Sequence, residues 1–216
     1  MRPGQKYAIA AAALLVVACD DNKPMAPGPQ PPANAADVVQ LLATAYRTQD
    51  FATFSVLLAD DFLFILDEPN PDNGETQWDA ATERRIHARM FDPQDIPMGD
   101  PSIPPDYWLQ QVTVVIELQT TFTERTDLYT TFNPPGPLDP AQWIAGSAVY
   151  SYDVFIQLAG DTAYRAQGRL EFTVIEDRTK QVGDAGKFLL YRWEDLGGIG
   201  PFAVEASWTT IKRLYK

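Results

Sequence analysis

The sequence predicts an α+β fold, in which N-terminal helices pack on a strongly curved antiparallel sheet. Apolar residues recur with helical spacing in three segments of the first half of the chain, and with a period of two in four segments between residues 108 and 193. Helices that precede a run of strands, instead of alternating with them, indicate helices gathered on one face of an antiparallel sheet. Strands with one apolar and one polar face fit such a sheet, because one of its faces packs on the helices and the other meets water.

The first two helices are expected over residues 37–48 and 51–58. Asn34 or Asp37 can cap the first helix and Asp50 the second, because a side-chain oxygen at this position accepts a hydrogen bond from a free amide of the first turn. The first helix carries one apolar stripe, formed by Val38, Leu41, Leu42, Ala45 and Tyr46.

A short strand and a third helix are expected next. Residues 62–66 (FLFIL) form an apolar run that predicts a buried strand, and the Asp, Asn, Pro and Gly content of residues 67–77 predicts a loop. Residues 79–90 predict the third helix, with apolar residues one turn apart. Residues 91–106 contain five prolines and are expected to form a long irregular connection.

Period-two alternation predicts four strands in the second half of the chain. The sequence AGDT at residues 159–162 suits a hairpin turn between the second and the third of them. After the last strand, Trp208, Ile211 and Tyr215 have the spacing of a short closing helix, with a strand as the alternative. The four alternating runs lie at residues 112–122, 150–158, 164–174 and 188–193.

Residues 1–18 are expected to be a signal peptide. Arg2 and Lys6 precede an apolar run of 12 residues, which is too short to span a bilayer as a helix. The sequence VVAC that ends at Cys19 resembles the lipobox of bacterial lipoproteins, which are cleaved before the cysteine and carry diacylglycerol on its sulfur. The resemblance implies a membrane anchor of acyl chains such as palmitate on Cys19, and two such chains give stable anchoring. A plain secretory signal with a chance cysteine is the alternative.

Three parts are therefore expected: a signal peptide over 1–18, the lipidated Cys19 with a proline-rich tether over 19–36, and one domain over 37–216. The tether has five prolines and little apolar surface to bury, so it is not expected to fold. Without Arg2 and Lys6 the chain has 15 basic and 29 acidic residues, a net charge of −14. Such a charge disfavours binding to nucleic acids. The expected location is the bacterial cell envelope, outside the cytoplasm.

The predicted order of elements resembles the NTF2-like family, also called SnoaL-like or cystatin-like, over residues 36–215. The segments ATAYRTQDFATFSVLLADDFLFIL, WDAATERRIHARMF, GKFLLYRWEDL and SWTTIKRLY carry this resemblance. It implies a cone with an apolar pocket between helices and sheet, in a family that includes isomerases, dehydratases, cyclases and binding domains. The tyrosine and carboxylate positions of the isomerases fall here on Leu42 and Leu66, with Asp67 one residue late, so that pair is not reproduced.

Three polar residues are the candidates for acid/base catalysis. His87, the only histidine, shares a helix face with Glu83, which could orient its imidazole. A surface histidine on an arginine-rich helix is the alternative. Asp153 would face the pocket if Tyr150 and Tyr152, on the opposite face of the same strand, faced solvent, and the alternative is an exposed Asp153 with buried tyrosines. Asp67 is the third candidate.

The expected function is that of a non-catalytic, membrane-anchored envelope lipoprotein that binds a small apolar ligand or a protein partner. The alternative is a lipid-anchored isomerase or hydrolyase with an acid/base residue in the pocket. No cofactor or metal is expected, because one histidine and scattered carboxylates lack ligand spacing. A homodimer through the outer sheet face is a further alternative. The expected ligand-binding wall, which could equally be plain core, consists of Tyr46, Phe64, Ile86, Trp193 and Trp208.

Overall fold

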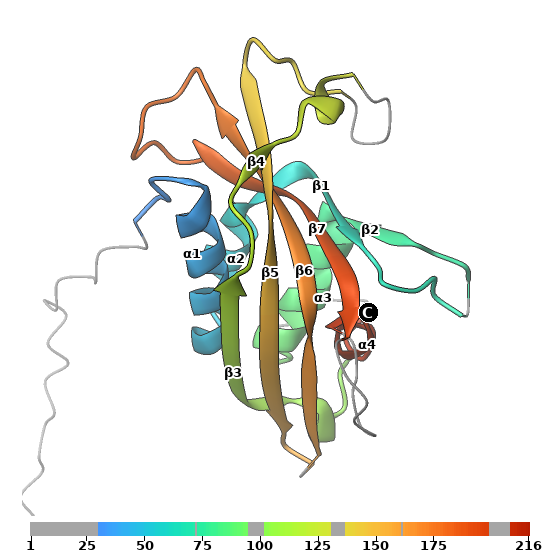
Figure 1. Ribbon diagram of the computed structural model, residues 1–216. Coiled ribbons are helices and arrows are strands. Elements are labelled where there is room, and N and C mark those ends of the chain that lie inside the picture. The colour runs from blue at the N-terminus through green and yellow to red at the C-terminus, as the bar shows by residue number, and fades with distance from the viewer. Residues whose placement is uncertain (1–29, 72, 95–101, 131–136, 161, 199–207) are drawn as a thin grey trace, which may run out of the picture.

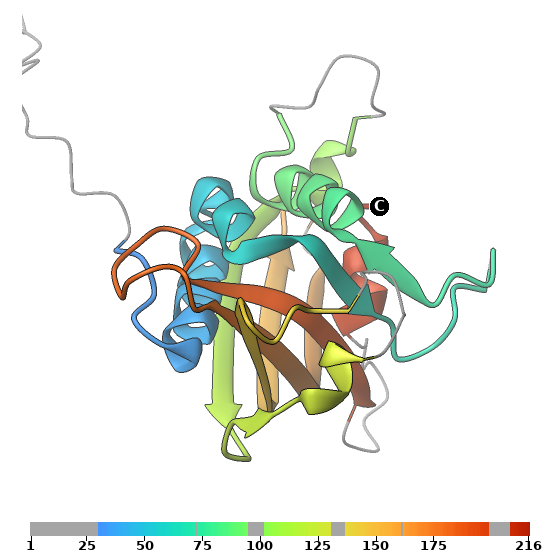
Figure 2. The same ribbon diagram turned by 90° about the horizontal axis from the view of Figure 1, so that it is seen from above.

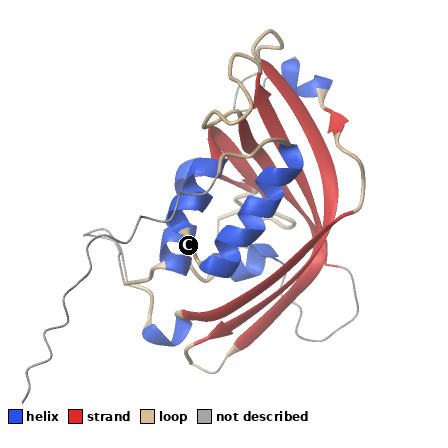
Figure 3. Cartoon of the chain, turned by 90° about the vertical axis from the view of Figure 1, so that its left-hand side faces the viewer, coloured by secondary structure: helices blue, strands red, loops and turns tan. Residues whose placement is uncertain are grey.

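The computed structural model describes residues 30–71, 73–94, 102–130, 137–160, 162–198 and 208–216 (Figure 1). In this part of the chain, helices lie in the hollow of a curved sheet of seven strands (Figure 3). The predicted α+β cone is therefore confirmed. The predicted signal peptide, Cys19 and the tether as far as residue 29 lie outside the described residues.

The helices begin where the sequence supplies capping side chains. α1 (Ala35–Thr48) is capped by Asn34, whose Oδ1 accepts a hydrogen bond from the amide of Asp37 at 3.0 Å. α2 (Phe51–Leu57) is capped in the same way by Asp50, which accepts from the amide of Thr53 at 3.0 Å. Both helices and their predicted caps are confirmed, as is the third helix, α3 (Ala80–Phe91).

The sheet has the strand order β2-β1-β7-β6-β5-β3, with the short β4 paired to β5. The four long strands are antiparallel neighbours, as predicted, whereas β1 runs parallel to β7. The sequence did not indicate β2, which pairs with β1 and lies where the expected loop meets the expected third helix. The strands are β1 (Leu58–Ile65), β2 (Gln77–Asp79), β3 (Leu109–Leu118), β4 (Thr123–Glu124), β5 (Trp143–Leu158), β6 (Ala163–Asp177) and β7 (Phe188–Gly198), and a 3-10 turn, η1 (Pro105–Tyr107), precedes β3.

A bulge in β7 changes which of its side chains face the helices. Trp193 is paired with Phe172 of β6, and Leu190 with Val174, so β7 has one residue more than β6 in this stretch. Leu190 therefore shares the inner face with Trp193. Strict alternation predicts Tyr191 on that face instead, and this prediction is wrong because one extra residue reverses the facing of the strand beyond it.

One end of the outer sheet face is covered. Alternation predicts a solvent-facing Thr173, yet this residue is only 2% exposed. Arg125, between β4 and η2 (Thr126–Tyr129), donates a hydrogen bond to Glu171 on the outer face at 2.9 Å, and Leu128 is buried. The segment from β4 through η2 therefore shields this end of the sheet (Figure 2).

A closing helix, α4 (Trp208–Arg213), lies against β6 and β7 and confirms the helical alternative for the C-terminal segment. Asp195 of β7 accepts hydrogen bonds from the amide and the hydroxyl of Thr209, at 3.0 and 2.9 Å. Arg89 of α3 donates to the backbone oxygen of Lys216 at 2.6 Å. These bonds fix α4 at the side of the core. None of the described helices is both long and apolar enough to span a membrane.

Candidate functional site

Four ionisable side chains lie together in the interior, between the helices and the inner face of the sheet. Tyr46 comes from α1, Glu83 and His87 from successive turns of α3, and Lys212 from α4, and none of them is more than 1% exposed. The spacing of four residues places Glu83 and His87 on one face of α3, as predicted. We refer to these four residues as the buried polar cluster.

The first half of this cluster is a tyrosine–histidine pair. The Nδ1 of His87 lies 2.8 Å from the backbone oxygen of Glu83, which can only accept a hydrogen bond, so Nδ1 carries the proton. The Nε2 atom therefore accepts from the hydroxyl of Tyr46. Burial, and then the positive charge of Lys212, lower the pKa of His87 well below its ordinary value, so the imidazole is neutral at pH 7. Burial and then the charge of Glu83 raise the pKa of Tyr46.

The second half is a buried carboxylate–ammonium pair. Lys212 Nζ donates to Glu83 Oε1 and lies 3.6 Å from the ring centroid of Phe64 and 3.7 Å from that of Trp193. Burial lowers the pKa of Lys212 to about 8, although Glu83 opposes this shift, and burial raises the pKa of Glu83. Both directions favour the uncharged forms. The same Oε1 lies 3.7 Å from Nδ1 of His87, so Glu83 joins the two pairs.

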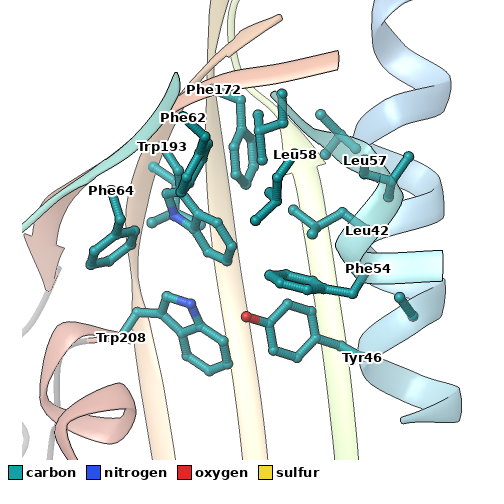
Figure 4. Close-up of a cluster of buried hydrophobic side chains, with 14 of the residues drawn as sticks. Leu42, Tyr46, Phe54, Leu57, Leu58, Phe62, Phe64, Phe172, Trp193 and Trp208 are labelled. Carbon is teal, nitrogen blue, oxygen red and sulfur yellow. The ribbon is translucent and has the colours of Figure 1, made fainter. Parts of the chain in front are cut away.

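Of the five side chains predicted to line a pocket, Tyr46, Phe64, Trp193 and Trp208 lie close together in the core (Figure 4), and Ile86 is also buried. We call these five residues the aromatic wall. The indoles of Trp193 and Trp208 are stacked with their ring centroids 6.2 Å apart, and Tyr46 meets Trp208 edge-on at 5.1 Å. Phe64 meets Trp193 at 5.4 Å. Four hollows formed by the described residues lie elsewhere, and none of these four is lined by the wall. That the five wall residues line a ligand pocket stays a prediction.

Three polar atoms of this region are buried without a hydrogen-bond partner in the described part of the chain: Glu83 Oε2, Trp193 Nε1 and Trp208 Nε1. Leaving a buried polar group unpaired costs about 1–3 kcal/mol, and native proteins pair nearly all such groups. A molecule that offers a donor to Glu83 and an acceptor to Trp193 would satisfy both atoms. The interior therefore has apolar walls, and some of its buried polar atoms lack a hydrogen-bond partner among the described residues.

The other two catalytic candidates lie away from the buried polar cluster. Asp67 is partly exposed, in the loop after β1, and its negative charge adds to burial in raising the pKa of Asp195. Asp153 lies on the outer face, where Arg165 donates to it at 2.6 Å and thereby lowers its pKa. Tyr150 and Tyr152, which precede Asp153 in β5, are buried, so the alternative arrangement is the one observed. Beside it lies a hollow of about 560 Å³, lined by Thr113, Val115, Asp153, Phe155, Ala163, Tyr164 and Arg165.

Lys212 is the member of the cluster that sequence reasoning missed. A lysine is usually solvent-exposed, so the helical spacing of Trp208 and Ile211 predicts only apolar residues on the buried face of this helix. The signal was its position four residues after Trp208, on the same helix face. At the isomerase positions, Leu42 and Leu66 are buried apolar residues, and Tyr46 lies one turn after Leu42. Within the described ranges, no three His, Cys, Asp or Glu side chains are grouped in a way that could hold a metal ion.

The sequence matches no protein-family model and no curated protein. Several solved structures are similar in fold. An NTF2-like protein of unknown function in nutrient uptake from Rhodospirillum rubrum is 17% identical, with 74% of this chain and 95% of that chain covered and a TM-score of 0.40. A ketosteroid isomerase-like protein from Erwinia carotovora atroseptica is 11% identical, with coverages of 77% and 95% and a TM-score of 0.42. A hexachlorocyclohexane dehydrochlorinase, LinA type 2, is 8% identical, with coverages of 74% and 79% and a TM-score of 0.40.

These neighbours include proteins described as NTF2-like and ketosteroid isomerase-like, in line with the family that the sequence resembles. At such low identities the likeness concerns the overall arrangement of helices and sheet. The chemistry of this chain has to be argued from its own residues.

Proposed function

We propose that this protein is a lipid-anchored protein of the bacterial cell envelope whose domain binds a small ligand in its interior, between the aromatic wall and the buried polar cluster. The ligand has an apolar, ring-like body and one polar group. The observation that carries this proposal is the presence of unpaired polar atoms among buried aromatic rings of the described residues, with Glu83 Oε2 and Trp193 Nε1 among them. A ligand that pairs with them would recover the free energy that their burial costs.

The ionisable groups support a functional role for this interior. Well-packed apolar side chains in place of a buried ion pair are often neutral or stabilising, so stability alone does not explain Glu83 and Lys212. Shifted pKa values are concentrated at functional sites, and Lys212, Glu83 and His87 all have them. The polar groups therefore fit a site that recognises one polar feature of an otherwise apolar molecule.

The anchor is proposed from the sequence. The basic residues, the short apolar run and VVAC have the order of a lipoprotein signal, and acyl chains on Cys19 would hold the domain at a membrane. Eleven residues, 20–30, separate Cys19 from the first prolines that the structure describes.

A matched pair of probes tests the binding site. We expect 1-naphthol to quench the tryptophan fluorescence of the full chain and to raise its melting temperature, and naphthalene to bind more weakly because it lacks the hydroxyl. Trp193→Phe keeps a ring but removes the N–H, so the two probes should differ less in their affinity for this variant than for the wild-type protein. Asp153→Asn on the outer face is the control and should leave binding unchanged. Absence of any effect of either probe on the wild-type protein would overturn the proposal.

A second candidate function is acid/base catalysis at the same site. The neutral His87 accepts a hydrogen bond from the hydroxyl of Tyr46. Tyr46 can therefore give a proton to a substrate or take one from it, while His87 returns a proton to Tyr46 or removes one from it. For an isomerase or hydrolyase of this kind, His87→Gln should abolish turnover while a substrate still binds. For a simple receptor, the same variant should weaken binding only slightly.

A protein partner would use a different surface. Val115 and Phe155 are 48% and 37% exposed and line the hollow on the outer face of the sheet. A second copy of the chain or another protein docked there would bury them. Sedimentation of the wild-type chain and of Phe155→Lys tests this role, because the substitution should lower the association only if this face is the interface.

A further inference from the structure

We infer that Lys212 is an amine nucleophile, and that the interior site binds aldehydes or ketones with an aromatic body by forming an imine with its Nζ atom. This inference rests on the proposed function, because it requires a ligand to enter the interior. It adds a covalent step and a chemical class of ligand. Nothing in the binding proposal itself requires Lys212 to react.

The surroundings of Nζ suit an amine that reacts with a carbonyl group. The Lys212 side chain is fully buried, and its Nζ lies between the rings of Phe64 and Trp193, within 4 Å of both centroids. Trp208 lies farther off, at 5.9 Å. These rings match the flat faces of an aromatic carbonyl compound, and they keep water away from an imine once it has formed.

The amine has a proton acceptor beside it. Glu83 is in contact with Nζ through Oε1, and burial favours transfer of the proton from the ammonium to the carboxylate, since both groups lose charge. With a pKa of about 8, the neutral amine is roughly 200-fold more abundant at pH 7 than that of an ordinary lysine with a pKa near 10.4. The neutral form is the nucleophile.

The second carboxylate oxygen of Glu83 distinguishes this site from an ion pair that has only a structural role. Glu83 Oε2 is buried and has no partner within the described residues, so the carboxyl group is not fully committed to holding Lys212. Lys187 provides the contrast, because it is also buried but donates to the backbone oxygen of Asp177 at 2.8 Å and pairs with Glu176 at 2.9 Å. Glu83 therefore keeps an oxygen that can carry a proton during the reaction.

The proposed step balances without a further reactant. The lone pair of Nζ forms a bond to the carbonyl carbon, and the carbonyl π electrons move to oxygen, which takes a proton from Glu83. Nζ returns a proton to Glu83, and the same carboxyl group then protonates the hydroxyl, which leaves as water while the C=N bond forms. The products are one protonated imine and one molecule of water, and Glu83 is left as a carboxylate beside the iminium nitrogen.

Reductive trapping tests the inference. The full chain is incubated at pH 7 with benzaldehyde and sodium cyanoborohydride, and each lysine is then assayed for a benzyl group by peptide mass spectrometry. We expect Lys212 to be modified at least about 10-fold faster than Lys187, and this preference to vanish in denaturant, where all lysines have similar pKa values. Because mapping on the wild-type chain identifies the site, the result does not depend on the folding of a variant.

One variant and one binding measurement separate the outcomes. Lys212→Arg keeps a cation beside Glu83 but cannot form an imine, so the fast-reacting site should disappear while the other lysines are unaffected. Modification at Lys187 that equals or exceeds that at Lys212 would overturn the inference. If benzaldehyde still quenches tryptophan fluorescence in that case, the binding proposal survives without the covalent step. If benzaldehyde and 1-naphthol both leave fluorescence and melting temperature unchanged, the binding proposal fails as well.

Discussion

The imidazole of His87 stacks on the ring of Phe54, with the ring centroids 3.7 Å apart and the ring planes 18° apart. Phe54 comes from α2 and His87 from α3, so the contact closes the interior between these helices. An apolar ring on one face of the imidazole withholds water and disfavours its charged form. The histidine is thus held neutral by packing as well as by its neighbour Lys212.

This packing predicts a loss of stability at acidic pH. The pKa of His87 is lowered in the folded chain, so the unfolded chain binds more protons below the ordinary value of about 6.5. The free energy of unfolding should therefore be at its full value above about pH 6.5 and fall as the pH drops, by at most about 1.4 kcal/mol per pH unit from this group. Urea unfolding between pH 5 and 8 measures the slope.

The matched variant for this prediction is His87→Gln, which cannot take up a proton. Glu83 and Asp195 have raised pKa values, so each gives a slope of opposite sign in the same range, stabilising the fold as the pH falls. The difference between wild type and variant isolates the histidine. Equal slopes in the two proteins would contradict a buried, neutral His87.

A double-mutant cycle should show strong coupling between Glu83 and Lys212. Lys212→Met leaves a buried carboxylate without its counter-charge, and we expect a loss of about 3–5 kcal/mol in the free energy of unfolding. Adding Glu83→Leu removes the unpaired charge, so the double variant should recover most of this loss. Losses that simply add would show that the two groups are not paired in the folded protein.

Much of the fold could be predicted because its elements have local signals. Asn34 and Asp50 mark helix starts through side-chain capping, and period-two alternation marks the long strands. The pairing of β1 with β7 could not be predicted in the same way, since nothing local in residues 58–65 tells a parallel neighbour from an antiparallel one. The β7 bulge and the cover over Thr173 also depend on partners distant in the sequence.

The candidate site was predictable only in part, for a related reason. The apolar wall followed from aromatic residues on the inner faces of predicted elements, and the Glu83–His87 spacing from helical periodicity. The burial of a charged residue cannot be predicted from its type alone. Lys212 is buried in the core, where it pairs with Glu83, which is 129 residues away in the sequence. The sequence alone does not show which face of the sheet Asp153 occupies, because this depends on the orientation of β5 in the sheet.

Two threonines on the outer face should differ in their sensitivity to substitution. Thr113 of β3 is exposed, so Thr113→Ala should change the free energy of unfolding by no more than about 0.5 kcal/mol. Thr173 of β6 is buried under the segment that includes Arg125, so Thr173→Ala should cost about 1 kcal/mol or more through lost contacts. Phe172→Ala, in the core, should cost about 3–5 kcal/mol and gives the upper reference. Equal effects of the two threonine variants in urea unfolding would show that the outer face is evenly exposed.

The proposed anchor gives the last prediction. If Cys19 carries diacylglycerol, the wild-type protein should sediment with membranes and enter the detergent phase of a two-phase extraction, because two acyl chains bind a bilayer stably. Cys19→Ser removes the sulfur that receives the lipid, so this variant should not be matured or acylated. A chain that begins at Asp20 behind a plain secretory signal should be recovered in the aqueous phase. Mass spectrometry of the N-terminal peptide distinguishes acylated from unmodified Cys19. Wild-type protein that is cleaved, unacylated and free of membranes would contradict the anchor, while the ligand-binding domain would be unaffected by that result.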